Sequence, residues 1–197
     1  MNQNIFPVFD EIAGRSEKEQ MLQQHGCALW FIGLSGSGKT TIARHIEQLF
    51  LQQGILTQLL DADNIRTGLN NNLGFSEADR VENIRRVAEV TKLFVECGIV
   101  TLNCFITPTN EIQAMVKDIV GKNNVIEIFV DTPLSVCESR DVKGLYRKAR
   151  EGQVAHFTGI SSPFEPPQNP SIHLQTNEMT LDLCVQKVVE YVLPKIH

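Results

Sequence analysis

Apolar residues along the chain gather in short runs, and these alternate with stretches that have helical spacing. The run 28–32 is continuously apolar and ends at Gly33, whereas apolar positions between residues 42 and 50 recur every three or four residues. This pattern predicts a buried strand, a turn and an amphipathic helix.

The same alternation continues to the end of the chain. We predict further strands over 57–60, 99–105, 125–130 and 172–174, and helices over 16–24, 81–97, 111–120, 133–139 and 181–193. Strands that alternate with helices indicate a parallel sheet covered on both faces. The sequence therefore predicts a three-layer α/β/α fold with a mainly parallel sheet of about five strands, whose active site lies at the carboxyl ends of the strands.

Two segments fall outside this rhythm. Residues 1–25 are polar and rich in glutamine, and we interpret them as an N-terminal extension packed on a domain of residues 26–197. Residues 143–170 combine basic side chains with several prolines and show little apolar periodicity. Long irregular segments inside compact domains usually form lids or binding loops, so we predict a lid there.

Composition narrows the range of partners. The chain is 42% hydrophobic and carries a net charge of −5, which disfavours nucleic acid and anionic membranes because both select basic surfaces. The start lacks the pattern of a secretion signal, and no apolar run is long enough to cross a membrane. Five widely spaced cysteines without a C-x-x-C pair indicate reduced thiols. Together these features predict a cytoplasmic protein.

Residues 33–40, GLSGSGKT, match the phosphate-loop pattern G-x-x-x-x-G-K-[ST] between the first predicted strand and helix. Glycines let backbone N–H groups converge on phosphate oxygens, and the helix start adds partial positive charge. Lys39 would reach the outer phosphates of ATP and Thr40 would ligate Mg²⁺. We predict nucleotide contacts from Gly33, Leu34, Ser35, Gly36, Ser37, Gly38, Lys39, Thr40 and Thr41.

The phosphate loop has an alternative explanation, a glycine-rich turn without a ligand. That explanation leaves a lysine followed by two hydroxyl residues unaccounted for. The pattern by itself does not separate kinases from GTPases or motor ATPases, but the guanine-reading sequence N-K-x-D is absent.

Two carboxylates, Asp61 and Asp63, follow the second predicted strand, at the edge where the loop would place the transferred group. Asp63 could accept the proton of an attacking hydroxyl, while Asp61 could hold Mg²⁺ through water. The alternative is that Asp63 only caps the next helix.

Basic and polar residues further along the chain suggest an anion clamp. Arg80 and Asn83 share a face of a predicted helix and could act with Arg66, although a solvated helix start explains them equally well. Thr107, after the next strand, either contributes a hydroxyl or caps a helix. Lys143 either closes over phosphates or belongs to a basic surface.

Seven segments together resemble the adenylylsulfate kinases, which make 3'-phosphoadenylylsulfate from adenylylsulfate and ATP. They are GLSGSGKT, DADNIR, LGFSEADRVENIRR, FITP, VDTP, RDVKGLYRKAR and FTGISSPFEPP, in the order and spacing of that family over about residues 28–176. The resemblance implies a P-loop kinase with ATP as co-substrate, Mg²⁺, adenylylsulfate as acceptor and commonly a homodimer. It also allows association with a sulfate adenylyltransferase.

The resemblance implies positions for both substrates. Acceptor contacts would come from Asp63, Arg66, Phe75, Arg80, Asn83, Ile106 and Thr107, and from Lys143, Leu145 and Phe157 of the lid. Phe75 would stack on the adenine of adenylylsulfate, and Arg140 would lie against the adenine of ATP. Thr107 replaces a serine that was proposed as a phosphorylated intermediate in many members, and Asn110 and Ser161 replace the usual arginine and aspartate.

The function that the sequence predicts is that of an adenylylsulfate kinase. The catalytic residues would be Lys39, Asp61, Asp63, Thr107 and Lys143. Two alternatives stay open: a kinase of the same fold for another small nucleotide, and a silent nucleotide-binding module that regulates a partner.

Overall fold

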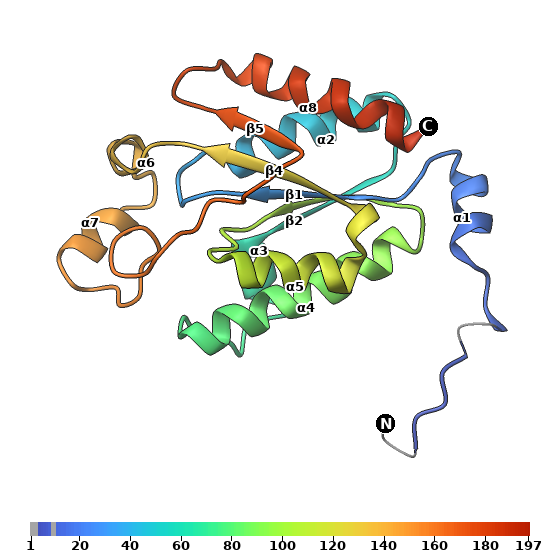
Figure 1. Cartoon of the computed structure of the whole chain (residues 1–197), viewed down its shortest axis with the longest axis horizontal. Coiled ribbons are helices and arrows are strands. Elements are labelled where there is room, and N and C mark those ends of the chain that lie inside the picture. Colours follow the sequence, from blue (N-terminus) through green and yellow to red (C-terminus); the bar gives the residue numbers. More distant parts are fainter. Residues whose placement is uncertain (1–3, 9–10) are drawn as a thin grey trace.

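Five parallel strands form the middle layer of the protein, in the order β2-β3-β1-β4-β5 (Figure 1). The computed structural model describes residues 4–8 and 11–197. The strands are β1 (Ala28–Ile32), β2 (Thr57–Asp61), β3 (Val100–Cys104), β4 (Val125–Asp131) and β5 (Ile172–Gln175). Every residue of the central strand β1 is buried, as its continuous apolar run predicts for a strand covered on both faces.

Helices cover both faces of this sheet, so the predicted three-layer fold is confirmed (Figure 1). The helices α2 (Lys39–Gln52) and α8 (Leu181–Ile196) lie on one face, and α4 (Glu77–Val95) and α5 (Asn110–Val120) lie on the other. Shorter elements lie at the two ends of the sheet: α1 (Arg15–Leu22), α3 (Ala62–Thr67), η2 (Lys122–Asn124), α6 (Leu134–Arg140) and α7 (Leu145–Arg150).

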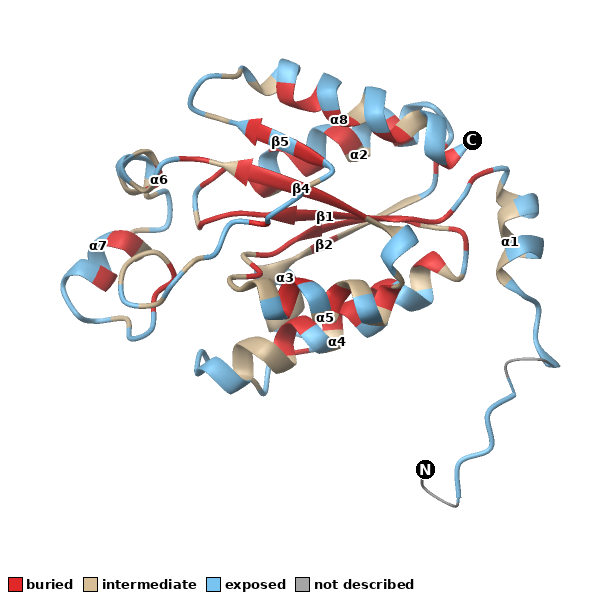
Figure 2. Ribbon diagram, in the orientation of Figure 1, coloured by how far each residue is buried: buried red, intermediate tan, exposed pale blue. Residues whose placement is uncertain are grey.

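Successive residues of β1 point to opposite cores. Leu29 and Phe31 pack with the apolar sides of α2 and α8, whereas Trp30 and Ile32 pack with those of α4 and α5. In Figure 2 the buried residues accordingly line the sheet and the helix sides that face it. Because each fully buried large side chain contributes about 1.5–3 kcal/mol, these two cores hold the layers together.

The predicted strands are confirmed to within one residue and most predicted helices to within three, whereas α3, α4 and α7 differ more. The helix predicted from residue 81 begins at Glu77, because Ser76 caps it and accepts a hydrogen bond from the Asp79 amide at 3.2 Å. Helices α3 and α7 were not predicted, since six residues are too few to show an apolar period.

The segment 143–170 is therefore not irregular throughout, and that part of the prediction was wrong. It contains α7 and builds a small apolar cluster of its own. The buried members of this cluster are Leu34, Cys137, Tyr146, Ala149 and Phe157. Because Leu34 belongs to the phosphate loop, the segment packs directly on that loop, as a lid would.

Helix α1 contacts the amino ends of the strands, at the opposite edge from α6 and α7 (Figure 1). Arg15 Nη2 donates to the Gly26 carbonyl at 2.6 Å, and Gln24 Nε2 donates to the Gly98 carbonyl at 2.7 Å. Residues 1–3 and 9–10 of the predicted extension lie outside the described residues, and the domain boundary at residue 25 stays a prediction.

Two smaller expectations concern cysteines and membranes. The five cysteines are free thiols, four of them buried and Cys97 exposed. Over residues 4–8 and 11–197, no helix has the length and apolar character needed to cross a bilayer.

Candidate active site

The phosphate loop joins β1 to α2 and has a backbone that requires glycine. Gly36 and Gly38 have φ of 74° and 106°, which side-chain-bearing residues rarely adopt. A Cβ at Gly33 would lie 2.5 Å from the Val130 carbonyl oxygen. The loop therefore lies against the end of β4, and a larger residue at position 33 would not fit.

Lys39 lies inside this loop with 8% of its surface exposed. Its ammonium group donates to the carbonyls of Gly33 at 2.8 Å and Leu34 at 2.7 Å, and burial lowers its pKa to about 8. The N-cap Gly38 supplies no side-chain acceptor to α2, and the first turn holds no acidic residue. The helix start thus favours an anion such as a phosphate group. Thr41 is exposed in the same turn.

Side chains that follow β4 and β5, and others from α6 and α7, donate hydrogen bonds to backbone carbonyls of the phosphate loop. The Ser37 carbonyl accepts hydrogen bonds from Thr132 Oγ1 and Thr176 Oγ1, both at 3.1 Å. Arg140 Nη1 donates to the Gly36 carbonyl at 3.2 Å, and Tyr146 Oη donates to the carbonyl of Ser35 at 2.8 Å. The roles of Thr132, Thr176 and Tyr146 could not be predicted from the sequence, because their contacts join segments far apart in the chain.

The two carboxylates after β2 have different surroundings. Asp61 is the N-cap of α3: its Oδ1 accepts from the Asp63 amide at 3.0 Å, and its Oδ2 accepts from Thr40 Oγ1 at 2.8 Å. The capping alternative considered for Asp63 therefore applies to Asp61. A hydroxyl and a carboxylate lie side by side next to the phosphate loop, and both are oxygen ligands that Mg²⁺ accepts.

Asp63 is exposed and forms an ion pair with Lys143 from the predicted lid. The side chains of Asp63 and Lys143 keep 68% and 59% of their surface accessible, so a substrate can reach both. Lys143 is thus brought to the site by the fold instead of decorating a distant basic surface.

Arg66 and Phe75 form a second group beside the carboxylates. The Arg66 guanidinium lies 4.4 Å from the centroid of the Phe75 ring and donates to the Gly74 carbonyl at 2.9 Å. Phe75 is 62% exposed, which is unusual for a large aromatic side chain. An exposed ring held in place by an arginine is suited to stacking on a base.

Arg80 and Asn83 are not a solvated helix start. Arg80 donates to Thr158 Oγ1 at 2.6 Å and to the carbonyl of His156, so it joins α4 to the lid. Burial lowers the pKa of Arg80 and of Arg66, but both stay charged because the ordinary pKa of arginine lies far above neutral pH. Asn83 is buried and accepts a hydrogen bond from Asn70.

Thr107 is buried and its hydroxyl accepts a hydrogen bond from Trp30 Nε1 at 2.9 Å. It does not cap α5, because Thr109 does so, which rules out that alternative. Thr107 has φ of 48°, a strained conformation for a β-branched residue, and Ile106 before it is half-buried. Both residues follow β3 at the edge of the sheet where the loop and carboxylates lie.

The remaining residues of the predicted lid pack among themselves and against the phosphate loop. The rings of Phe157 and Tyr146 meet edge to face with centroids 4.9 Å apart, and Leu145 packs on the same cluster. An open surface hollow of about 540 Å³ is lined by Leu34, Leu134 and residues 159–164.

The amino-acid sequence matches a known enzyme family. The family model described as "Adenylylsulphate kinase" matches residues 25–175. The chain belongs to the adenylylsulfate kinase family. This membership confirms the resemblance found in the sequence and the P-loop kinase fold.

Two relatives and one solved structure of this family are similar to most of the chain. An adenylyl-sulfate kinase of Bacteroides fragilis is 55% identical over 195 residues, covering 99% of this chain and 96% of its own length. One from Clostridium kluyveri is 50% identical, covering 94% of this chain and 92% of its own length. The structure of the APS kinase CysC of Mycobacterium tuberculosis in complex with AMPPNP and APS is 44% identical and gives a TM-score of 0.82, covering 86% of this chain and 98% of that one.

Proposed function

We propose that the protein transfers the γ-phosphoryl group of ATP to the 3'-hydroxyl of adenylylsulfate, giving ADP and 3'-phosphoadenylylsulfate for sulfate activation. The observation that carries the proposal is the meeting of Asp63 and Lys143 beside the phosphate loop of an adenylylsulfate kinase family member. Its relatives are named as adenylyl-sulfate kinases, and a similar structure holds AMPPNP and APS.

ATP would bind with its phosphates against the loop backbone and Lys39, and with its adenine against Arg140. Residues Thr40 and Asp61 fit Mg²⁺, because their oxygens are adjacent in the structure. In the part of the chain that the structure describes, no cluster of three or more His, Cys, Asp or Glu side chains could hold a metal. A cation that shares ATP phosphates needs only one or two protein oxygens, and when bound it supplies positive charge at the phosphates.

The chemical step needs positioning and charge more than covalent chemistry. The 3'-oxygen of the acceptor forms a bond to the γ-phosphorus, the bond to the bridging oxygen of ADP breaks, and Asp63 takes the hydroxyl proton. Lys143 contacts Asp63 Oδ2, which leaves Oδ1 for the hydroxyl. Lys39, Lys143 and Arg66 would offset the negative charge of the moving group.

The acceptor would bind between Phe75 and the lid, with Arg66, Arg80 and Asn83 around its phosphosulfate group. Ile106, Leu145 and Phe157 would supply apolar contacts. A homodimer, an association with a sulfate adenylyltransferase and a cytoplasmic location stay predictions from the sequence.

The position of the new phosphate is the direct test of this reaction. We expect mass spectrometry and ³¹P NMR of the product to show one added phosphate on the 3'-oxygen, with one ADP for each product molecule. A phosphate on another oxygen would contradict the role given to Asp63.

Replacing Phe75 with alanine should raise the KM for adenylylsulfate by about 5- to 150-fold, because stacking on an aromatic ring stabilises a bound base by about 1–3 kcal/mol. The KM for ATP, measured with the same variant, should not change. Phe75→Tyr is the matched control and should retain near-normal kinetics. Equal increases in both KM values would contradict an acceptor role for Phe75.

Chelation with excess EDTA should abolish ADP release, and added Mg²⁺ should restore it. Asp61→Asn should raise the Mg²⁺ concentration needed for half-maximal rate, because it removes a carboxylate charge next to Thr40. Full turnover in EDTA would contradict the proposed metal site.

A further inference from the structure

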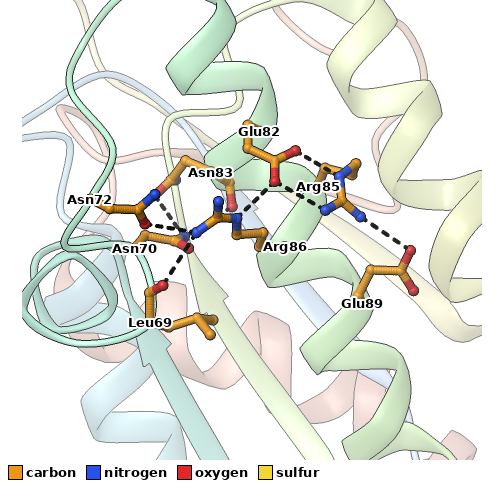
Figure 3. Close-up of polar contacts among 8 residues, drawn as sticks. All are labelled: Leu69, Asn70, Asn72, Glu82, Asn83, Arg85, Arg86 and Glu89. Carbon is orange, nitrogen blue, oxygen red and sulfur yellow. Dashed lines mark hydrogen bonds and ion pairs between the residues drawn. The ribbon is translucent and has the colours of Figure 1, made fainter.

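Asn70 is a polar side chain in the loop between α3 and α4, and none of its surface is exposed. Figure 3 shows it between that loop and α4, where it faces Asn83. Its Nδ2 donates to Asn83 Oδ1 at 3.0 Å and to the Asn83 backbone carbonyl at 3.3 Å. The backbone N–H of Asn70 also donates to the Ile65 carbonyl at 3.0 Å, which anchors the loop to α3.

These contacts fix which way the Asn83 amide points. A backbone carbonyl can only accept, so the Asn70 atom that faces it must be the NH₂ group. The Asn83 side-chain atom beside the same NH₂ group must then be the oxygen. Consequently the NH₂ group of Asn83 is left to donate elsewhere, and an NH₂ donor suits an anionic ligand where a carbonyl oxygen would repel it.

The arrangement is unfavourable for packing alone. Asn70 Oδ1 is buried without a hydrogen-bond partner among the residues that the structure describes. An unpaired buried oxygen destabilises a fold, and an aliphatic side chain would avoid it. A role in holding Asn83 explains the presence of an asparagine here.

A second contact holds the same loop to α4. Arg86 Nη1 donates to Asn72 Oδ1 at 2.9 Å and reaches the Leu69 carbonyl at 3.5 Å, while its Nε donates to Glu82 at 2.7 Å (Figure 3). Hydrogen bonds from two arginines lower the pKa of Glu82 to about 2, so it stays ionised at neutral pH.

The neighbouring Arg85 provides an internal comparison. It shares Glu82 with Arg86 and also pairs with Glu89 at 3.6 Å, so all of these contacts stay within α4 (Figure 3). Arg85 and Arg86 thus make similar ion pairs on one helix, but the hydrogen bonds to the loop come from Arg86.

We propose that Asn70 is a positioning residue for the acceptor, which turns the NH₂ group of Asn83 toward the anionic group of the nucleotide, and that Arg86 holds the loop carrying Asn70. The inference rests on the proposed function, since it assigns Asn83 to the acceptor. The same loop leads into Phe75, so its position affects both the anion and the base of the acceptor.

The test measures KM for adenylylsulfate and for ATP in Asn70→Leu, Asn83→Ala and the double variant, with thermal melting to verify folding. We expect Asn70→Leu to raise the acceptor KM about 10-fold, the size of one hydrogen bond to a charged group, with the ATP KM unchanged. In the Asn83→Ala background the same replacement should add little, because Asn70 acts through Asn83.

The arginine pair keeps the proposal testable if Asn70→Leu fails to fold. Arg86→Ala should raise the acceptor KM several-fold, and Arg85→Ala, the matched control, should leave both KM values unchanged. The inference would be overturned if Arg86→Ala and Arg85→Ala raised the acceptor KM equally, or if Asn70→Leu raised it by the full amount in the Asn83→Ala background. Either result would leave the proposed function standing. A wild-type protein without adenylylsulfate turnover would overturn the proposed function as well.

Discussion

An Asp63→Ala variant should turn over adenylylsulfate about 10²- to 10⁴-fold more slowly than the wild type, because a general base contributes about that much to the rate. Its affinity for ATP should stay nearly unchanged, since Asp61 and not Asp63 contacts Thr40. The measurements are single-turnover kinetics and calorimetric titration with ATP. Loss of turnover with intact ATP binding would locate the defect in the chemical step.

Two control variants accompany this prediction. Asp63→Asn keeps the size of the side chain but cannot take the proton, so it should be as slow as Asp63→Ala. Asp118→Ala removes an exposed carboxylate on α5, whose side chain is 67% accessible, and should leave turnover unchanged. If Asp63→Ala kept more than about a tenth of the wild-type rate, Asp63 would not be the general base.

A Lys39→Met variant should lose about 100-fold or more in turnover and bind ATP weakly, because it removes the buried charge nearest the phosphates. In the wild type, saturating ATP should raise the melting temperature, as any ligand of the folded state does. In the variant this increase should be largely lost. An undiminished ATP-induced shift would contradict the assignment of Lys39 to the phosphates.

Lys39→Met also needs a control for changes in the conformation of the phosphate loop. The Lys39 ammonium group holds the Gly33 and Leu34 carbonyls, so methionine could also disturb the loop. Lys39→Arg keeps the charge and its donors and should retain more ATP binding than Lys39→Met. The exposed Lys122, whose side chain is 78% accessible, offers a lysine replacement that should change neither property.

The sequence predicts β1 and the phosphate loop well because local physics determines both. A continuous apolar run can be buried on both faces, and the glycines of the loop allow backbone angles that other residues avoid. The start of α4 was predicted four residues late, because Ser76 caps it well before the apolar stripe begins at Val81.

Contacts between distant segments explain what the sequence could not supply. Thr132 follows β4 and Thr176 follows β5, and both donate hydrogen bonds to the Ser37 carbonyl. Their spacing in the sequence does not predict this shared contact. Asn70 lies in a run of three asparagines that looks like an exposed loop, yet packing of α4 buries it completely. Such roles depend on how the layers fold over one another.

The two carboxylates of the candidate site were predicted in part from the sequence. Asp61 and Asp63 could both be proposed from their place after a strand, but the helix cap was considered for Asp63 alone. The structure gives the cap to Asp61 and the lid contact to Asp63. The residue types were sufficient to propose Asp61 and Asp63 as site residues. The backbone geometry of α3 was needed to show which of them caps the helix.

The central claim is that this chain phosphorylates adenylylsulfate, and the release of ADP from MgATP tests it most directly. The assay compares adenylylsulfate with AMP, adenosine and a cytidine diphosphate analogue at equal concentration. We predict strong turnover with adenylylsulfate and little with the other three. Turnover only with another nucleotide would contradict the acceptor, and no turnover with any of the four would contradict kinase activity altogether.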